Sequence, residues 1–165
     1  MIHIGHILNE DHLRIDRLLG EVFQLAQAFD VQAPTSARGR RLGDEPDPAL
    51  ERMKSEIHIK WNAIEAGLLN HMQAEETFLF PVLRQMDMQE AIALQGEHQA
   101  LRSTFTEIGT GVVIATSPIT AHFANLLRTH TKRETELLYA WASAHAPANV
   151  AETLRVRLKR TFLDC

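Results

Sequence analysis

The chain has 165 residues, 45% of them hydrophobic and 23% charged, a mixture that predicts a single globular domain over residues 1–165 and excludes a disordered chain. Its net charge of −4 argues against nucleic acid and anionic membranes as partners, and no apolar run approaches the roughly 20 residues that cross a bilayer. Cys165 is the only cysteine and the N-terminus turns polar too early for a secretory signal, so we expect a cytoplasmic protein.

The first part of the chain shows one amphipathic helix followed by a break. Over residues 7–29 apolar residues recur every three or four positions, the period of an α-helix with one buried face, and Asn9 or Asp11 is a candidate cap near its start. Residues 31–47 then combine prolines, glycines and charges of both signs. Such a composition predicts a long flexible connector.

Two further helices are expected after the connector. The second begins near Asp47, an acidic residue ahead of a proline that fits a first helical turn, and its apolar pattern continues to Leu79. Pro81 lies inside this pattern, so we expect the helix to kink or end there. The third helix is expected over residues 89–113, where two glycines weaken the final turns.

A fourth helix completes the predicted fold. Ser117 fits a cap ahead of it, its apolar stripe continues to Trp141, and Pro147 ends it before a shorter helix over residues 148–162. Long amphipathic helices joined mostly by short connections predict an all-α fold, an up-and-down four-helix bundle with a short extra C-terminal helix. We expect the core of this bundle within about residues 7–145.

A repeated spacing of histidine and glutamate marks the second and fourth helices. His71 precedes Glu75 by four positions, and His130 precedes Glu134 by the same interval. Residues four apart on a helix lie about 40° apart around it and about 6 Å apart along it. Each pair can therefore bind the same pair of metal ions from one helix face.

The first and third helices each add an acid followed by a histidine. These are Asp11-His12 and Glu97-His98, and each histidine lies in the apolar stripe of its helix. The histidines of the second and fourth helices lie in apolar stripes as well. All four helices therefore direct a histidine into one core, and two glutamates accompany them. The candidate metal ligands are His12, His71, Glu75, His98, His130 and Glu134.

Burial of these groups favours a bound metal ion. A single histidine in an apolar stripe is usually a hydrogen-bonded core residue, but two glutamates in a dry core cost several kcal/mol each unless they are protonated or bind a cation. Six ligands are more than one closed tetrahedral zinc site uses. The absence of a thiolate among them excludes iron–sulfur clusters and soft copper sites. Calcium prefers oxygen ligands, so four imidazoles do not suit it. Iron, manganese and zinc remain, and the four-residue spacing differs from the Glu-x-x-His of ferritin-like bundles.

Four motifs within residues 7–141 carry this arrangement: Glu10-Asp11-His12, His71-x3-Glu75-Glu76-x2-Leu79-Phe80-Pro81, Glu97-His98-x3-Arg102 and His130-x3-Glu134. Together they resemble the hemerythrin-like HHE cation-binding domain family. The resemblance implies an up-and-down bundle around a non-haem di-iron centre bridged by two carboxylates and oxygen. It implies these ligands: His12 and His71 for one iron, His98 and His130 for the other, and Glu75 and Glu134 as bridges.

Two positions depart from the oxygen-carrying members of that family. Arg102 stands where the carriers have a second histidine on the third helix, and Glu134 lies four residues after its histidine where the carriers have an aspartate five residues after. The chain therefore resembles more closely the bacterial HHE proteins and the relatives that sense iron or repair iron–sulfur centres. The lost histidine should weaken the second metal site or leave it more open to small ligands.

Several neighbouring polar residues allow two interpretations. Glu76 could replace Glu75 as a ligand, although a supporting or solvated role is the more common one. Asp11 and Glu97 could accept hydrogen bonds from the imidazoles, as carboxylates near metal sites often do, or could face water. His122 lies two turns before the last ligand histidine, too far to bind the same ion, and either lines an access path or lies at the surface.

The function that these observations favour is binding of oxygen, nitric oxide or a similar small ligand, in sensing, storage or stress protection. The alternative is a di-iron enzyme that reduces peroxide or oxygen, oxidises ferrous iron or repairs iron centres. A degenerate or structural site, with zinc or manganese in place of two iron ions, is the third interpretation. No nucleophile triad or phosphate-binding loop occurs in the sequence, which favours binding over catalysis. The expected partner is a diatomic or peroxide ligand, and a homo-oligomer is compatible with the sequence.

Overall fold

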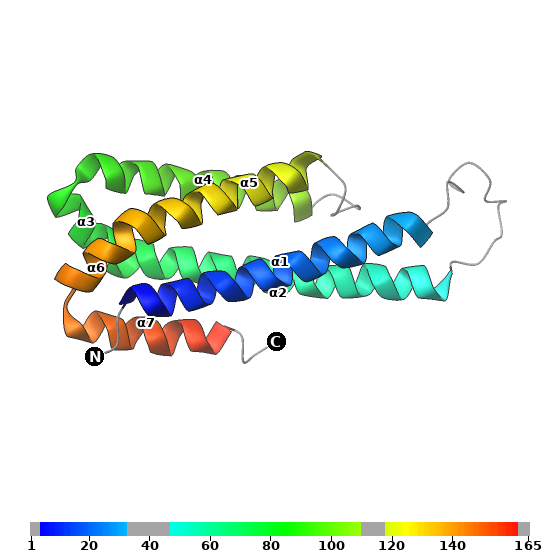
Figure 1. Cartoon of the computed structure of the whole chain (residues 1–165), viewed down its shortest axis with the longest axis horizontal. Helices are drawn as coiled ribbons and strands as arrows, with labels where there is room; N and C mark the ends of the chain where they lie inside the picture. Colours follow the sequence, from blue (N-terminus) through cyan, green and yellow to red (C-terminus); the bar gives the residue numbers. More distant parts are fainter. Residues whose placement is uncertain (1–3, 33–46, 110–117, 162–165) are drawn as a thin grey trace.

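The computed structural model describes residues 4–32, 47–109 and 118–161, which are helical almost throughout (Figure 1). The elements are α1 (Ile4–Gln32), α2 (Pro48–Phe78), α3 (Phe80–Met86), α4 (Met88–Gly109), α5 (Pro118–Arg133), a π-helical turn η2 (Glu134–Leu138), α6 (Tyr139–His145) and α7 (Ala148–Thr161). No strand occurs in these three ranges. The prediction of an all-α fold is confirmed.

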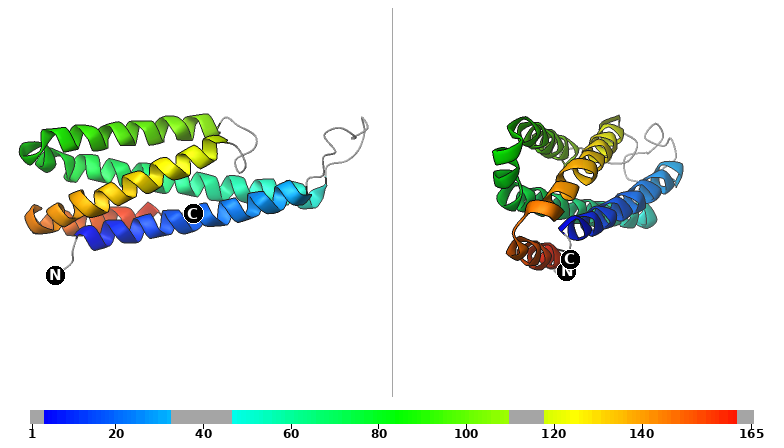
Figure 2. Two further views of the ribbon diagram at one scale, coloured as in Figure 1. Left: turned by 45° about the horizontal axis from the view of Figure 1, so that its top comes forward. Right: turned by 60° about the vertical axis from the view of Figure 1, so that its left-hand side comes forward.

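The long helices form the expected up-and-down bundle. Its four rods are α1, α2, α4 and the continuous run of α5, η2 and α6, and successive rods run in opposite directions (Figure 1). The short α7 lies outside these four, against α1 and α2, which the end-on view in Figure 2 shows clearly. Within the described ranges, no helix is both long and apolar enough to cross a membrane.

Local sequence sets two of the helix boundaries as predicted. The carboxylate of Asp47 accepts a hydrogen bond of 2.8 Å from the backbone N–H of Ala49, with Pro48 in the first turn of α2. This arrangement satisfies one of the free N–H groups at the helix start. At the other end, α2 stops at Phe78 and α3 restarts with Pro81 in its first turn, which confirms the predicted break.

The start of the first helix differs from the prediction. α1 begins at Ile4, before the expected residue 7, and it extends to Gln32. The proposed caps Asn9 and Asp11 are therefore wrong, because both lie inside the helix. Asp11 is buried, and its carboxylate bonds to His71 on α2. The predicted cap Ser117, the end of the third helix after Gly109 and most of the predicted connector lie outside the described residues.

The buried side chains form two apolar clusters with a polar layer between them. One cluster joins the start of α1 to α3, α6 and α7, and the other fills the opposite end around Trp61, Phe105 and Phe123. On α1 the boundary falls between Leu8 and Ile15, where His12 lies. On each of the other three rods, the two clusters also meet near the histidine of that rod. The buried layer holds Asp11, His12, His71, Glu75, His98, His130 and Glu134.

Candidate metal centre

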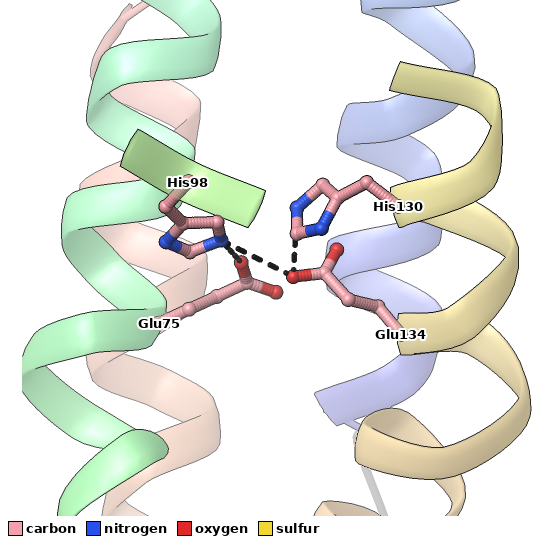
Figure 3. A group of neighbouring side chains, drawn as sticks. All are labelled: Glu75, His98, His130 and Glu134. Carbon is pink, nitrogen blue, oxygen red and sulfur yellow. Dashed lines mark hydrogen bonds and ion pairs between the residues drawn. The ribbon is translucent and has the colours of Figure 1, made fainter. Parts of the chain in front are cut away.

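The six candidate ligands all lie in the buried layer, each with 5% exposure or less. Their donor atoms form two groups in which all atoms lie within 4.8 Å of one another. We call the side with His98 and His130 the α4–α5 half, and the side with His12 and His71 the α1–α2 half. The first group is Glu75, His98, His130 and Glu134, drawn in Figure 3, and the second is His12, His71 and Glu134.

Both carboxylates reach from one half to the other. Glu134 places Oε1 3.0 Å from Nε2 of His130 and Oε2 3.3 Å from Nε2 of His12. Glu75 places Oε1 3.4 Å from Nε2 of His71 and Oε2 3.5 Å from Nε2 of His98. Each glutamate therefore divides its two oxygens between the two halves, which is the geometry of a carboxylate that bridges two ions.

Three of the imidazoles are oriented by a carboxylate from an adjacent rod. Nδ1 of His71 lies 2.9 Å from Asp11, and Nδ1 of His130 lies 2.9 Å from Glu97. With Nδ1–H donating outward, Nε2 is left to bind a metal ion inside the layer. The interpretation of the two acids as hydrogen-bond acceptors agrees with the structure, although each bonds to a histidine of a neighbouring rod and not to the one beside it in the sequence.

The third such acceptor is Glu76, which lies 2.8 Å from Nδ1 of His98. Glu76 also receives two hydrogen bonds, of 2.8 and 3.0 Å, from the guanidinium of Arg102. Glu76 therefore supports a ligand histidine without belonging to either donor group. Arg102, which stands where the oxygen carriers have a second histidine, forms an ion pair with Glu76. His122 is exposed and lies outside the layer.

A second arginine connects the layer to the surface. Arg133 donates to Glu97 at 2.8 Å and to both oxygens of Glu90 at 2.7 and 2.8 Å. Because Glu97 in turn holds His130, a chain of charges runs from the α4–α5 half to solvent. On the other side of the layer, Oδ1 of Asp11 has no hydrogen-bond partner among the described residues.

Tyr139 also reaches into the layer, and the sequence pattern did not indicate it. Its phenol oxygen lies 3.1 Å from Oε2 of Glu134, 3.2 Å from Nε2 of His71 and 3.3 Å from Nε2 of His12. Tyr139 comes five residues after Glu134, a spacing that places two side chains about 140° apart on an α-helix of 3.6 residues per turn. The π turn between them removes this separation, and the apolar periodicity of the sequence gives no signal of that turn.

The donor atoms of the layer fit a cation because several of them have no other partner. Neither oxygen of Glu75 makes a hydrogen bond of acceptable geometry within the described part of the chain, and the same holds for Nε2 of His130. A buried carboxylate without a partner costs several kcal/mol. Metal ions bound in the two halves would satisfy all three atoms.

Protons balance the charge of the layer when it holds no metal. Burial opposes the charged form of His98 and His130, but nearby carboxylates outweigh burial and raise the pKa of both imidazoles to about 9. These carboxylates are Glu134 and Glu75 for His98, and Glu134, Glu97 and Glu75 for His130. Burial also opposes ionisation of Glu134, yet the surrounding histidines hold its pKa well below its usual range. Metal ligands must be deprotonated, so a bound ion would take the place of these protons.

A cleft reaches the layer from one side. It has a volume of about 440 Å³, runs between α1 and α5, and is lined by His12 together with Phe23, Arg128 and Lys132. His12 is therefore the candidate ligand that a small molecule entering through this cleft would meet. The two cationic side chains would favour entry of an anion.

Comparison with known proteins agrees with this geometry. The family model for the hemerythrin HHE cation binding domain matches residues 3–142. The matched range contains every residue of the buried layer and also Tyr139. No curated protein and no solved structure matches the chain.

Proposed function

Because the chain belongs to the hemerythrin HHE cation-binding domain family, we propose that its buried layer holds a non-haem di-iron centre. Each rod of the bundle contributes one histidine, and α2 and η2 contribute the bridging carboxylates. The ligands that we assign are His12 and His71 for one iron, His98 and His130 for the other, and Glu75 and Glu134 as bridges between them.

The observation that carries this proposal is the carboxylate of Glu75. It is fully buried, both of its oxygens lack a hydrogen bond among the described residues, and the two oxygens are directed to imidazoles of different halves. Burial of a carboxylate that makes no hydrogen bond is unfavourable, whereas a carboxylate between two metal ions is strongly stabilised. Mixed imidazole and carboxylate donors suit iron, and they also suit manganese and zinc, which are the other outcomes of the test.

We assign to this centre the binding of oxygen, nitric oxide or a similar small ligand, in sensing, storage or stress protection. Bound iron would supply a redox-active position at which such a ligand coordinates. The protein would orient the imidazoles through Asp11, Glu76 and Glu97, exclude bulk water and admit the ligand through the cleft beside His12. The side chains that we assign do not fill the coordination shells of two ions, so positions remain for the ligand.

The test is metal analysis of protein expressed with iron, combined with its visible spectrum. We expect about two irons per chain and a ferric absorption that changes on reduction and on exposure to nitric oxide. His130→Ala should lower the iron content, whereas His122→Ala, an exposed histidine on the same helix, should not. Zinc in place of iron, or two irons retained in the His130 variant, would overturn the assignment. Sustained turnover with peroxide would replace ligand binding by an enzymatic function.

A further inference from the structure

We infer that Tyr139 is a seventh protein ligand of the centre, with its phenol oxygen bound to the ion of the α1–α2 half. The inference deepens the proposed function and rests on it. The assigned ligands of that half are His12, His71 and the bridging glutamates, and the phenol oxygen lies among their donor atoms. It adds a phenolate oxygen to a six-residue ligand set of imidazoles and carboxylates.

The spacing of the donor atoms supports coordination. Metal–ligand bonds of about 2.1 Å separate neighbouring donors by about 3.0 Å in an octahedral site and about 3.4 Å in a tetrahedral one. The phenol oxygen lies 3.1, 3.2 and 3.3 Å from the donor atoms of Glu134, His71 and His12. The nitrogen of His12 and the oxygen of Glu134 are themselves 3.3 Å apart. The phenol oxygen, which also lies 3.4 Å from Nδ1 of His12, is therefore at the distance from each of these three donor atoms that two ligands of one ion have from each other.

The backbone places Tyr139 at this position. Its N–H donates to the carbonyl of Glu134, the five-residue bond of a π turn, so the two side chains leave the rod on the same face. Such single π turns are frequently found at functional sites in other helical proteins. On an unbroken α-helix the phenol would point about 140° away from Glu134 and out of the layer.

A close approach of two rods fixes the tyrosine further. A Cβ atom on Gly5 would lie 3.2 Å from Cβ of Tyr139 and 3.3 Å from Oγ of Ser143, so the glycine lets α1 lie directly against α6. The backbone N–H of Gly5 donates to the same Ser143 oxygen. Tyr139 is only 3% exposed, and its ring packs against His12 with centroids 5.7 Å apart. Its hydroxyl is held in the layer with little freedom to turn away.

Coordination changes the protonation of the phenol. Without metal, burial and the negative charges of Glu134 and Glu75 keep the pKa of Tyr139 well above its usual range. A bound cation reverses the sign of that local field, and the phenol proton passes to solvent as the oxygen–metal bond forms. With this extra donor, the ion of the α1–α2 half keeps fewer open positions than the ion of the α4–α5 half.

The experiment exploits the fact that the chain contains one tyrosine. Any tyrosinate signal must therefore come from Tyr139. Resonance Raman spectra of the ferric protein should show tyrosinate ring modes, and these should shift when the protein is grown with ring-deuterated tyrosine. Tyr139→Phe should remove the modes and their visible band while it retains more than half of the iron. Trp61→Phe changes a buried aromatic residue in the apolar cluster away from the layer and should leave the modes unchanged.

The outcomes separate this inference from the proposed function. Wild-type protein with two irons and no tyrosinate modes would overturn the role of Tyr139 and leave the di-iron centre standing. Protein that binds no iron would overturn both. The wild-type spectrum decides the question even if the Tyr139→Phe variant fails to fold. Tyrosinate modes that survive Tyr139→Phe would identify a contaminant as their source and would also overturn the assignment.

Discussion

The two halves of the buried layer hold their histidines in different electrostatic surroundings. In the α4–α5 half, the acceptors Glu76 and Glu97 are each 26% exposed and are paired with Arg102 and Arg133. In the α1–α2 half, the acceptor Asp11 is only 2% exposed, and one of its oxygens lacks a partner among the described residues. Water can reach the acceptors of the first half and can replace a lost hydrogen bond there. In the second half the acceptor is almost fully buried, so the same chemical change there should have a larger effect.

The largest effect is expected where the two halves share a residue. Glu134→Ala removes the carboxylate that belongs to both donor groups, so the iron content should fall from about two per chain to below one. The histidines around it would lose their buried counter-charge, and the loss of stability should be about 3–5 kcal/mol. Metal analysis and thermal unfolding measure the two effects.

Glu136→Ala is the matched control for this variant. Glu136 lies in the same π turn, but its side chain is 62% exposed. Its replacement should leave both the iron content and the melting temperature nearly unchanged. If Glu134→Ala behaved like this control, the shared carboxylate would have no role in either half.

The second prediction compares the acceptors directly. Asp11→Asn should weaken metal binding in the α1–α2 half by roughly 10- to 100-fold, the range typical for loss of the group that orients a ligand histidine. Glu97→Gln should have a smaller effect, because the Glu97 side chain is 26% exposed and water can take its place as hydrogen-bond acceptor for His130. Metal-competition titrations on both variants give the ratio. Equal losses would contradict the contrast between a buried acceptor and a partly exposed one.

The third prediction concerns pH. Without metal, the nearby carboxylates outweigh burial and raise the pKa of His98 and His130 to about 9, above the ordinary value of 6.5. Each histidine therefore adds stability that is fully present below about pH 6.5 and is lost as the pH rises to about 9. The melting temperature of the metal-free protein should fall across this window.

Metal binding should follow the opposite trend, since the ion competes with the same protons. Its apparent affinity should rise by up to about tenfold per pH unit for each proton displaced. Burial and the neighbouring His71 lower the pKa of His12, so the α1–α2 half has one imidazole proton to release, compared with two in the α4–α5 half. In Tyr139→Phe, which has no phenol proton, titrations should show a shallower pH dependence for the α1–α2 half. A steeper pH dependence in this variant would contradict the expected difference in proton release between the two halves.

The fold was predictable because its signals are local. The apolar period of 3.6 residues and the prolines at Pro48 and Pro81 determine the rods and two of their ends. The start of α1 was not predictable in this way. Ile4 and Leu8 are buried against residues of α6 and α7, and these distant contacts extend the helix beyond the point that a capping pattern indicated.

The candidate site was predictable in its centre and not in its surroundings. A histidine in the stripe of each rod must point to the shared core, so the six central residues follow from periodicity alone. The partners of the imidazoles do not, because Asp11 bonds across the bundle to His71 and not to the adjacent His12. Tyr139 was missed for a different reason, since the π turn shifts the helical register by one residue after Glu134.

The smallest effect is expected at the surface of the α4–α5 half. Arg102 is 34% exposed, and its ion pair with Glu76 is open to solvent, so Arg102→Ala should destabilise the protein by about 1 kcal/mol or less. For a chain of this length, that corresponds to a decrease of roughly 2–4 °C in the melting temperature. Glu76 would still accept the hydrogen bond from His98, so iron should remain bound with less than about a tenfold loss of affinity.

Arg128→Ala provides the reference for this measurement, because Arg128 is exposed and its guanidinium donates to Asn125 on its own helix. A loss of iron in Arg102→Ala that is absent from Arg128→Ala would show that Arg102 fixes Glu76, and through it His98, as firmly as burial fixes Asp11. In that event Arg102 would still affect metal binding, although the oxygen carriers have a metal-binding histidine at its position. It would act through the carboxylate of Glu76 and not by binding the metal itself. The two halves would then differ in their exposure but not in their rigidity.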